Sequence, residues 1–194
     1  MLKASLSRSA VVAFDGTSDT MALPSSDSTL AFLHTSAVFD IFVCARAKRN
    51  KYGVLCANSF NPPDKGITID RDPNTHELTL FIWMAGVFKS LPTSSYFPDS
   101  SAKFLPGIAN KLLFRSQGTG TVLSASANFV NFYGGVGALP ALPVGNATAP
   151  MTIGSYAAGN FLDFDLHDLL IYNRNLSSGE LVTMGTYFSE RYGV

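Results

Sequence analysis

The C-terminal part of the chain joins a strand pattern to a helix pattern through a polar corner. Residues 161–172 read FLDFDLHDLLIY, and apolar side chains occupy both parities in the second half of this segment. That pattern predicts a long strand whose second half is covered on both faces. After the corner, Ser177 and Glu180 have the spacing of a capping box, which predicts a helix start. The apolar face of this helix comprises Leu181, Met184 and Phe188.

Most of the remaining chain reads as short strands separated by turns. Apolar or alternating segments lie at 10–14, 20–23, 36–46, 52–57, 66–71, 77–83, 111–115, 121–126, 128–133 and 151–154. A short helical turn is expected at 29–34. Many short strands with one late helix predict an all-β protein, a two-sheet antiparallel sandwich of jelly-roll type with one short C-terminal helix. Neither a repeat nor a linker is evident, so residues 1–194 are predicted to form a single domain.

The charge content is low and balanced. The chain carries 14 basic and 14 acidic residues, and charged residues make up 14% of it, against about 25% in a typical domain. This balance argues against nucleic acid or an anionic membrane as a partner. A charge-poor surface favours coverage by other subunits, in a homo-oligomer or a larger assembly. The alternative is a neutral surface rich in Ser, Thr and Asn.

Targeting signals are not evident in the sequence. It contains no apolar run long enough for a transmembrane helix. Its first residues, MLKASLSRSAVVAF, lack the apolar core of a signal peptide. We therefore expect a chain that stays in a cytoplasm or leaves it inside an assembly.

Two cysteines flank a basic turn. Cys44 and Cys56 lie on either side of RAKRNK at 46–51. If a hairpin closes near Asn50, the cysteines face each other with Cα atoms ~5 Å apart, which permits a disulfide. In a reducing compartment two buried thiols are favoured instead. The basic side chains of the turn could meet an acidic glycan or a partner, although a solvated hairpin tip is the favoured interpretation. They are Arg46, Lys48, Arg49 and Lys51.

Both ends of the chain carry motifs that match a known family. The closing strand and corner match at Leu166, Asp168, Leu170, Ile171, Tyr172, Asn173, Arg174, Leu176, Ser177 and Glu180. FDGTSDTMALP at 14–24 and FDIFVCARA at 39–47 match the opening strands. These motifs resemble the laminin G-like jelly rolls of the concanavalin A-like lectin and glucanase superfamily, a type common in bacterial and bacteriophage proteins. The sequence departs from the family pattern at two positions. The family often has Gly at the position of Phe164, and it has Trp at the position of Ala45. The resemblance implies a jelly roll, a fold that hosts lectins, glycosidases, adhesion modules and virion parts.

The sequence contains no evident catalytic set. The E-x-D-x-E motif of the retaining glucanases in this superfamily, which places two carboxylates for catalysis, is absent. The nearest pattern is Asp163, Asp165 and His167, which alternate along the closing strand. We interpret them as a solvated edge, so that Asp165→Asn should leave folding nearly intact. A nucleophile elbow, a zinc motif and a phosphate loop are also absent, and the chain is predicted not to be an enzyme.

The resemblance implies a calcium site in the first turn. Many jelly rolls of this type hold one Ca²⁺ through Asp side chains and backbone carbonyls, because a hard cation needs several oxygen ligands. Asp15 and Asp19 are the candidate ligands, with Asp163 or Asp165 approaching them from the closing strand. The alternative is an Asx turn. No other cofactor is expected.

Exposed aromatic side chains are the candidates for glycan binding, because sugar rings stack on them. Tyr96 and Phe97 lie in a long Ser- and Pro-rich loop at 89–107, and Tyr96 is the best candidate. Trp83 and Tyr133 are further candidates, although a place in the core or at its rim is favoured for both.

Two functions from different classes fit these observations. The principal hypothesis is a non-catalytic structural or adhesion subunit of a bacteriophage virion, as a capsid-decorating or tail or fibre protein that contacts host glycans. The alternative is a free carbohydrate-binding lectin module, secreted or at a cell surface, and a glycoside hydrolase is less favoured. The low charge content and the missing catalytic set support the principal hypothesis.

Overall fold

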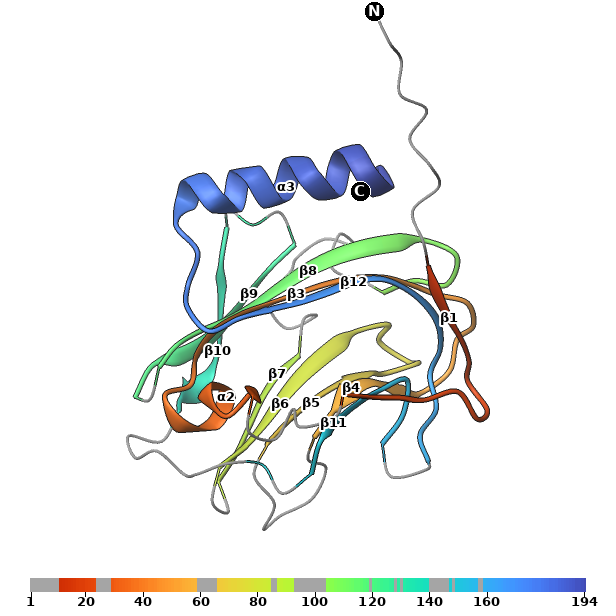
Figure 1. The fold of residues 1–194 in the computed structure, drawn as a ribbon, viewed down its shortest axis with the longest axis horizontal. Helices are drawn as coiled ribbons and strands as arrows, with labels where there is room; N and C mark the ends of the chain where they lie inside the picture. Colours follow the sequence, from red (N-terminus) through yellow and green to blue (C-terminus); the bar gives the residue numbers. More distant parts are fainter. Residues whose placement is uncertain are drawn as a thin grey trace, which may run out of the picture.

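The protein folds as two antiparallel β-sheets packed face to face, with a helix lying on the outer face of one of them (Figure 1). The computed structural model describes residues 11–23, 29–58, 66–84, 87–92, 104–118, 120–127, 129, 131–139, 147, 149–156 and 159–194. This architecture confirms the predicted all-β sandwich with one short C-terminal helix. No helix of the described residues is long and apolar enough to cross a membrane.

Within the described residues each sheet has six strands, and hydrogen-bonded neighbours run antiparallel. In spatial order, the first sheet contains β1 (Val12–Asp15), β12 (Asp163–Tyr172), β3 (Val38–Ala47), β8 (Ala109–Gln117), β9 (Val122–Ser126) and β10 (Tyr133–Ala138). The second sheet contains β2 (Met21–Leu23), β11 (Met151–Ile153), β4 (Gly53–Ala57), β5 (Gly66–Arg71), β6 (Leu78–Met84) and β7 (Val87–Pro92). The helices are α2 (Phe32–Thr35) and α3 (Ser178–Tyr192).

The main core lies between the two sheets. Apolar side chains that alternate along the strands fill this core, as expected from the sequence. In β5, for example, Ile67 and Ile69 point inward and are fully buried. At one edge of the core, the rings of Phe14 and Phe164 stack with centroids 4.6 Å apart. Strands that follow each other in sequence often belong to opposite sheets, so the chain must cross between layers at both ends of the sandwich.

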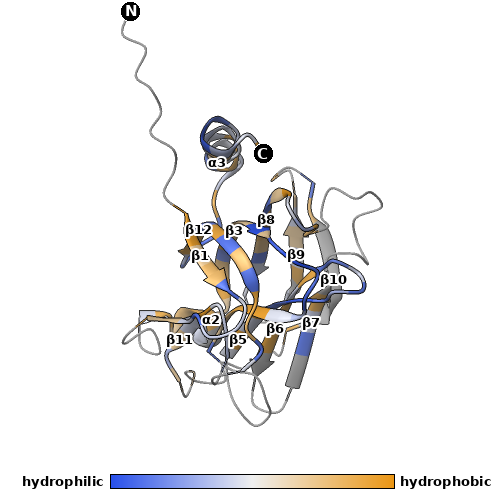
Figure 2. Cartoon of the chain, turned by 90° about the vertical axis from the view of Figure 1, so that its right-hand side faces the viewer, coloured by the Kyte–Doolittle hydropathy of each residue, from blue (hydrophilic) through white to orange (hydrophobic). Residues whose placement is uncertain are grey.

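A second apolar cluster lies between the first sheet and α3. Its buried members are Phe42, Cys44, Leu113, Phe129, Leu176, Leu181 and Phe188. Figure 2 shows α3 over this sheet, with hydrophilic residues on the side turned away from it. Asp168 of β12 also accepts hydrogen bonds from the hydroxyls of Tyr187 and Tyr192, at 3.0 and 2.6 Å. The helix is therefore fixed by both apolar and polar contacts.

A β-bulge at His167 changes which residues of β12 face the core. The register against β3 shifts between Leu166 and Asp168, so one residue is extra on β12. The side chains toward the inter-sheet core are Phe164, Leu166, Leu169 and Ile171, and those toward α3 are Leu170 and Tyr172. The second half of β12 therefore contacts apolar clusters on both faces, as predicted, although its side chains are only half-buried. Because of the bulge, residues of the same parity before and after His167 face opposite sides of the sheet.

The predicted hairpin between β3 and β4 is wrong. The two strands belong to different sheets, so the basic turn between them is a crossing and not a hairpin tip. Cys44 faces the α3 cluster, whereas Cys56 lies in the inter-sheet core. Both cysteines are buried and free, which agrees with the interpretation as two thiols and not with a disulfide.

Candidate functional site

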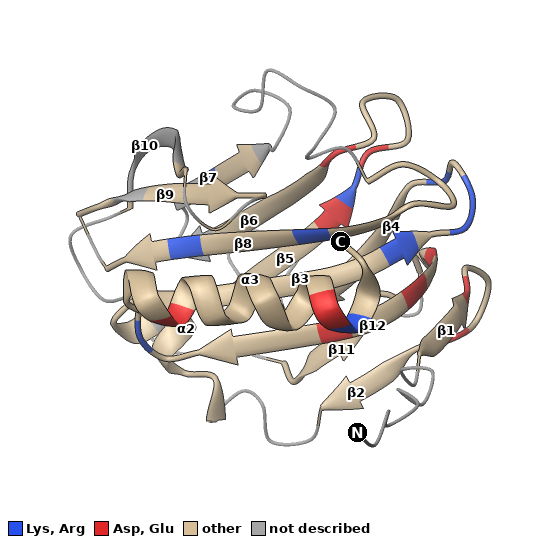
Figure 3. Cartoon of the chain, turned by 90° about the horizontal axis from the view of Figure 1, so that it is seen from above, with Lys and Arg blue, Asp and Glu red and all other residues tan. Residues whose placement is uncertain are grey.

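The acidic residues at the start of β12 form ion pairs with the basic turn. Asp163 and Asp165 are only 4% and 6% exposed. Asp163 lies 2.9 Å from Nε of Arg49, and Asp165 accepts hydrogen bonds from Nε and Nη2 of Arg46 at 3.1 and 2.5 Å. Lys48 lies within 3.5 Å of both carboxylates. Figure 3 shows the basic residues of this turn beside acidic residues of the neighbouring strands.

These contacts correct one expectation drawn from sequence and refine another. The carboxylates are not a solvated edge, because β3 pairs with β12 and brings Arg46 opposite Asp165. The basic turn is exposed, as expected, but it is a crossing between the sheets and its side chains pair with nearly buried carboxylates. The ring nitrogens of His167 are buried and have no hydrogen-bond partner among the described residues, so the ring does not bond to either carboxylate. Burial lowers the pKa of His167, with Arg46 acting in the same direction. The arrangement is a structural ion-pair network.

Asp15 organises the turn that follows β1. One of its carboxylate oxygens accepts hydrogen bonds from the backbone N–H groups of Thr17, Ser18 and Asp19, at 2.7, 2.9 and 3.1 Å. These bonds hold the pKa of Asp15 well below its ordinary value. Asp19 in turn accepts a hydrogen bond from the backbone N–H of Asp15 at 2.9 Å. This is the Asx turn that the sequence offered as the alternative.

The side-chain oxygens of this turn are already engaged within the turn itself. The carboxylate oxygens point at backbone donors, whereas Ca²⁺ needs six to eight oxygen ligands around one point. Among the described residues, no group of three or more His, Cys, Asp or Glu could hold a metal ion. Calcium binding through Asp15 and Asp19 stays an untested prediction, and the geometry gives both side chains a different role.

The predicted aromatic residues for glycan binding fall where the structure gives no side-chain information. Tyr96 and Phe97 lie outside the described residues. Trp83 lies in β6 and Tyr133 in β10, but their side chains are also outside the described part. Their backbones pair with those of Gly66 and Ala125, respectively. A role for these four residues in glycan binding therefore stays a prediction.

A different aromatic residue lines a pocket at one end of the sandwich. This pocket has a volume of about 450 Å³ and is formed by the turn after β1, the crossing before β4 and the turn before β12. Its lining residues are Gly16, Thr17, Lys51, Tyr52, Asn160 and Phe161. Tyr52 is 37% exposed, so part of its ring is accessible. Sequence reasoning missed this site because its three segments are distant in sequence and Tyr52 reads as the start of a strand.

The Tyr52 ring is held in place by a buried carboxylate. Its hydroxyl donates a hydrogen bond to Oδ2 of Asp70, with 3.1 Å between the oxygens. Asp70 is 8% exposed, and burial raises its pKa to about 7, although the hydrogen bond from Tyr52 acts in the opposite direction. Burial also raises the pKa of Tyr52. The phenol therefore stays neutral at physiological pH.

Arg71 anchors the loop that carries Tyr52. Its side chain is fully buried. Its guanidinium donates to the carbonyls of Lys51 and Phe104, at 2.9 and 3.0 Å, and to Oδ1 of Asn50 at 3.2 Å. One nitrogen also lies 3.0 Å from Nδ1 of His76. Because a buried cation needs its donors satisfied, Arg71 fixes the backbone of the loop on one side of the pocket.

A hydrogen bond joins two of the segments that line the pocket. Nζ of Lys51 donates a hydrogen bond to the carbonyl of Gly16. Gly16 has a φ of +69°, and a Cβ atom there would come within 2.7 Å of Cβ of Asp163. A glycine is therefore required at this position. The pocket thus brings a partly exposed tyrosine together with Thr17, Lys51 and Asn160.

Comparisons with known proteins identify the fold. No protein-family model matches the chain, and no curated protein matches it. The CBM40 of the Ruminococcus gnavus IT-sialidase, bound to α2,3 sialyllactose, is similar with a TM-score of 0.62 and 10% identity, over 90% of this chain and 96% of that one. A heptameric SAP-like pentraxin from Limulus polyphemus has a TM-score of 0.57 and 13% identity, over 92% of this chain and 82% of that one.

Larger sialidases contain a similar part. A Trypanosoma rangeli sialidase in complex with 2,3-difluoro-KDN has a TM-score of 0.59 and 13% identity, over 95% of this chain but only 28% of that one. At these identities the likeness shows the fold alone. The two-sheet β-sandwich fold is shared with these proteins, and membership of the concanavalin A-like superfamily stays a prediction. Membership of the laminin G-like, bacteriophage type stays a prediction.

Proposed function

We propose that this chain is a non-catalytic, lectin-like module that binds carbohydrate in the pocket beside Tyr52. The observation that carries the proposal is the partly exposed Tyr52, which is fixed by Asp70 and lines a surface pocket. Sugars bind through stacking on an aromatic face and hydrogen bonds to a few polar groups. Thr17 and Asn160 line the same pocket, and a hydroxyl and an amide are groups of the kind that bind sugars.

The solved structures support a glycan as the ligand class. The R. gnavus CBM40 has the same fold over nearly the whole chain and is described in complexes with α2,3 and α2,6 sialyllactose. This chain matches only part of each sialidase, so a hydrolase activity receives no support from those proteins. The carboxylates closest to a catalytic pattern, Asp163 and Asp165, are engaged in ion pairs.

A structural or adhesion role in a bacteriophage virion is the second candidate. The low charge content favours it, and so do exposed apolar residues such as Ile108 at 52% and Val182 at 64%. Localisation in a virion and contact with other subunits belong to this proposal. A sizing column separates the two candidates, because a stable monomer that binds a glycan contradicts assembly. An oligomer without any glycan signal contradicts the lectin proposal.

The test is a glycan array followed by calorimetric titration with the best glycan. Tyr52→Ala should weaken binding about two- to tenfold, since stacking on one aromatic ring contributes roughly 0.5–1.5 kcal/mol. Val182→Ala, in an exposed position on α3, is the control and should bind like the parent. Tyr96→Ala tests the candidate drawn from sequence. The proposal fails if no glycan binds, or if Tyr52→Ala binds as well as the parent.

A further inference from the structure

The basic turn at 46–51 carries four cationic side chains, and three of them are neutralised by the start of β12. The ion pairs join Arg46 to Asp165, Arg49 to Asp163, and Lys48 to both carboxylates. The fourth cation is Lys51, and among the described residues no carboxylate forms an ion pair with it. Lys51 is also exposed to solvent. Its charge is therefore accessible to a ligand.

Lys51 lines the pocket beside Tyr52 and is held in place at both ends. Its backbone carbonyl accepts a hydrogen bond from the buried guanidinium of Arg71 at 2.9 Å. Its Nζ donates to the carbonyl of Gly16. An ammonium has several donors, and one neutral carbonyl occupies a single donor without cancelling the charge. The remaining donors of Lys51 are thus fixed at the wall of the pocket.

The acidic residues near the pocket do not compete for this cation. Among the described lining residues none is acidic. The carboxylate of Asp15 accepts hydrogen bonds within its own turn, from backbone N–H groups and from Oγ of Ser18 at 3.2 Å. Asp19 accepts from the backbone N–H of Asp15. Asp70 is only 8% exposed and is bonded to the hydroxyl of Tyr52. Lys51 is therefore the charged side chain that the pocket presents.

The wall across from the basic turn is built to a fixed position. The backbone N–H of Val54 donates to the carbonyl of Asn160 at 2.8 Å. A Cβ atom at Gly53 would come within 2.6 Å of Cα of Leu162, so this segment packs directly against the β4 backbone. Asn160 has a φ of +54°, in the left-handed region that Asn enters more readily than most residues. Asn160 is thus fixed relative to Tyr52, the residue before Gly53.

We propose that the pocket beside Tyr52 selects a sugar with an anionic group, a carboxylate or a sulfate ester, and that Lys51 pairs with this group. The inference rests on the carbohydrate binding proposed above and names the ligand class. Hydrogen bonds from an ammonium to an anion are roughly twice as strong as neutral ones. Tyr52 contributes the apolar face for the sugar ring, whereas Lys51 decides which sugars bind. Lys51 is therefore a specificity-determining residue.

The selectivity is local and not a property of the whole surface. The chain has a formal net charge of zero, so it does not attract anions in general. The neighbouring cations of the turn are already paired with Asp163 and Asp165. Because Lys51 is exposed, its attraction for an anionic sugar is screened by salt. The preference for acidic over neutral sugars should therefore shrink as the salt concentration rises.

The test compares acidic sugars with neutral counterparts by calorimetric titration of the full chain. The pairs are sialyllactose and its methyl ester, trigalacturonate and its methyl ester, and sulfated lactose and lactose. At low salt the acidic member of a binding pair should bind about three- to tenfold more tightly than the neutral one. A preference in the first two pairs identifies a carboxylate as the group, and a preference in the third identifies a sulfate ester.

Two substitutions at Lys51 and one elsewhere isolate its role. Lys51→Gln should abolish the preference while leaving the affinity for the neutral sugar and the melting temperature close to those of the parent. Lys51→Arg should restore the preference. Lys89→Gln is the matched control, because it removes the same charge from β7, two strands away from β4 in the sheet order. It should bind like the parent. A purely structural role of Lys51 would change both members of a pair equally.

Each result decides between the two proposals. Equal binding of acidic and neutral sugars that is weakened by Tyr52→Ala overturns the selection by Lys51 and leaves the lectin proposal standing. A preference that survives in Lys51→Gln, or that Lys89→Gln also abolishes, likewise overturns the role of Lys51. If no sugar of any pair binds, the lectin proposal and the inference fail together.

Discussion

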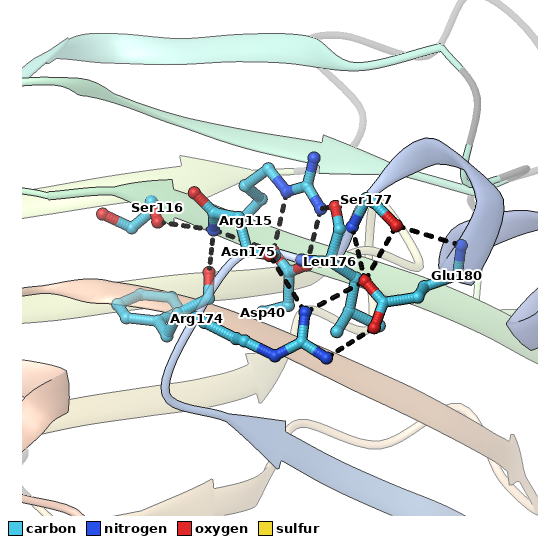
Figure 4. Close-up of polar contacts among 9 residues, drawn as sticks. Asp40, Arg115, Ser116, Arg174, Asn175, Leu176, Ser177 and Glu180 are labelled. Carbon is cyan, nitrogen blue, oxygen red and sulfur yellow. Dashed lines mark hydrogen bonds and ion pairs between the residues drawn. The ribbon is translucent and has the colours of Figure 1, made fainter.

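Asp40 and Arg115 form a buried, two-point ion pair beneath the corner that joins β12 to α3 (Figure 4). Nε and Nη2 of Arg115 donate to the two oxygens of Asp40, at 2.7 and 2.6 Å. Asp40 is fully buried and also accepts a hydrogen bond from the backbone N–H of Leu176 at 2.8 Å. The side-chain amide of Asn175 donates to the carbonyls of Phe39 and Ser116, at 3.0 and 2.9 Å. The corner is thus fixed to β3 and β8.

Asp40→Asn should therefore destabilise the protein strongly. The substitution keeps the shape of the side chain but leaves the guanidinium of Arg115 buried without a countercharge, which typically costs about 3–5 kcal/mol. Urea denaturation followed by fluorescence measures the loss. Arg174→Ala is the matched control, because Arg174 pairs with Glu180 at the surface and such pairs contribute roughly 0–1 kcal/mol. Equal losses for the two variants would contradict the role of Asp40.

The start of α3 was predictable because its signal is local. The capping box is confirmed, as Oγ of Ser177 accepts from the backbone N–H of Glu180 and the Glu180 carboxylate accepts from that of Ser177. Neighbours in sequence determine this geometry. Asp40 was recognisable only as a polar residue in an apolar strand. Its partner Arg115 lies on another strand, and no local pattern connects the two.

The features that sequence analysis missed depend on pairing between distant segments. The bulge at His167 becomes visible only when β12 is aligned with β3. The turn 46–51 reads as a hairpin because apolar strands flank it, and only the sheet order shows that β4 belongs to the other layer. The pocket beside Tyr52 has the same origin, since three loops meet there through the crossing of strands between sheets.

Phe42 is expected to contribute more to stability than Tyr172. The Phe42 ring is fully buried and contacts the rings of Phe129, Tyr172 and Phe188, with centroids 5.1, 5.8 and 6.2 Å away. Phe42→Ala should cost about 3–5 kcal/mol in the free energy of unfolding. Tyr172 is only partly buried, so Tyr172→Ala should cost less, roughly 2 kcal/mol. The reverse order in thermal denaturation would show that α3 does not pack on Phe42.

Asp165→Asn should also reduce stability, in contrast to the expectation drawn from sequence. Asp165 is nearly buried and accepts two hydrogen bonds from Arg46. Loss of the charge weakens these bonds, and a hydrogen bond to a charged group contributes about 1.5–3 kcal/mol. Denaturation at low and high salt provides the measurement. Because Arg46 is partly exposed, the difference between the variant and the parent should shrink as salt increases.

Both thiols should be unreactive in the folded protein. Burial raises the pKa of Cys44 and of Cys56 to about 12, and Asp168 adds to the effect at Cys44. Since the thiolate is the nucleophile, a disulfide reagent at pH 8 should modify neither residue until the protein unfolds. Because the thiols ionise near pH 8.5 in the unfolded chain but near 12 in the folded protein, their burial does not oppose folding below about pH 8.5. As the pH rises from there toward 12, the free energy of unfolding falls. Rapid labelling of Cys44 in native protein would indicate local opening under α3, and labelling of Cys56 would indicate opening of the inter-sheet core.

Asp70 should make the protein less stable as the pH rises from about 4 to 7. The pKa of Asp70 is about 7 in the folded state and about 3.9 in the unfolded chain. Between these values the folded state retains a proton that the unfolded state has released, so the free energy of unfolding falls by up to about 1.4 kcal/mol per pH unit. Below this window both states are protonated and above it both are ionised, so the contribution of Asp70 is then constant.

Asp70→Asn isolates this contribution, because the amide cannot ionise but can still accept the hydrogen bond from Tyr52. Thermal denaturation from pH 4 to 9 should show the variant gaining stability relative to the parent up to about pH 7, with a constant difference above that. In Tyr52→Phe the ionised carboxylate loses a hydrogen bond, and the pKa of Asp70 should rise further. The window in which the parent and Asp70→Asn diverge should then extend to higher pH when both carry Tyr52→Phe. A difference that does not depend on pH would mean that Asp70 remains ionised throughout.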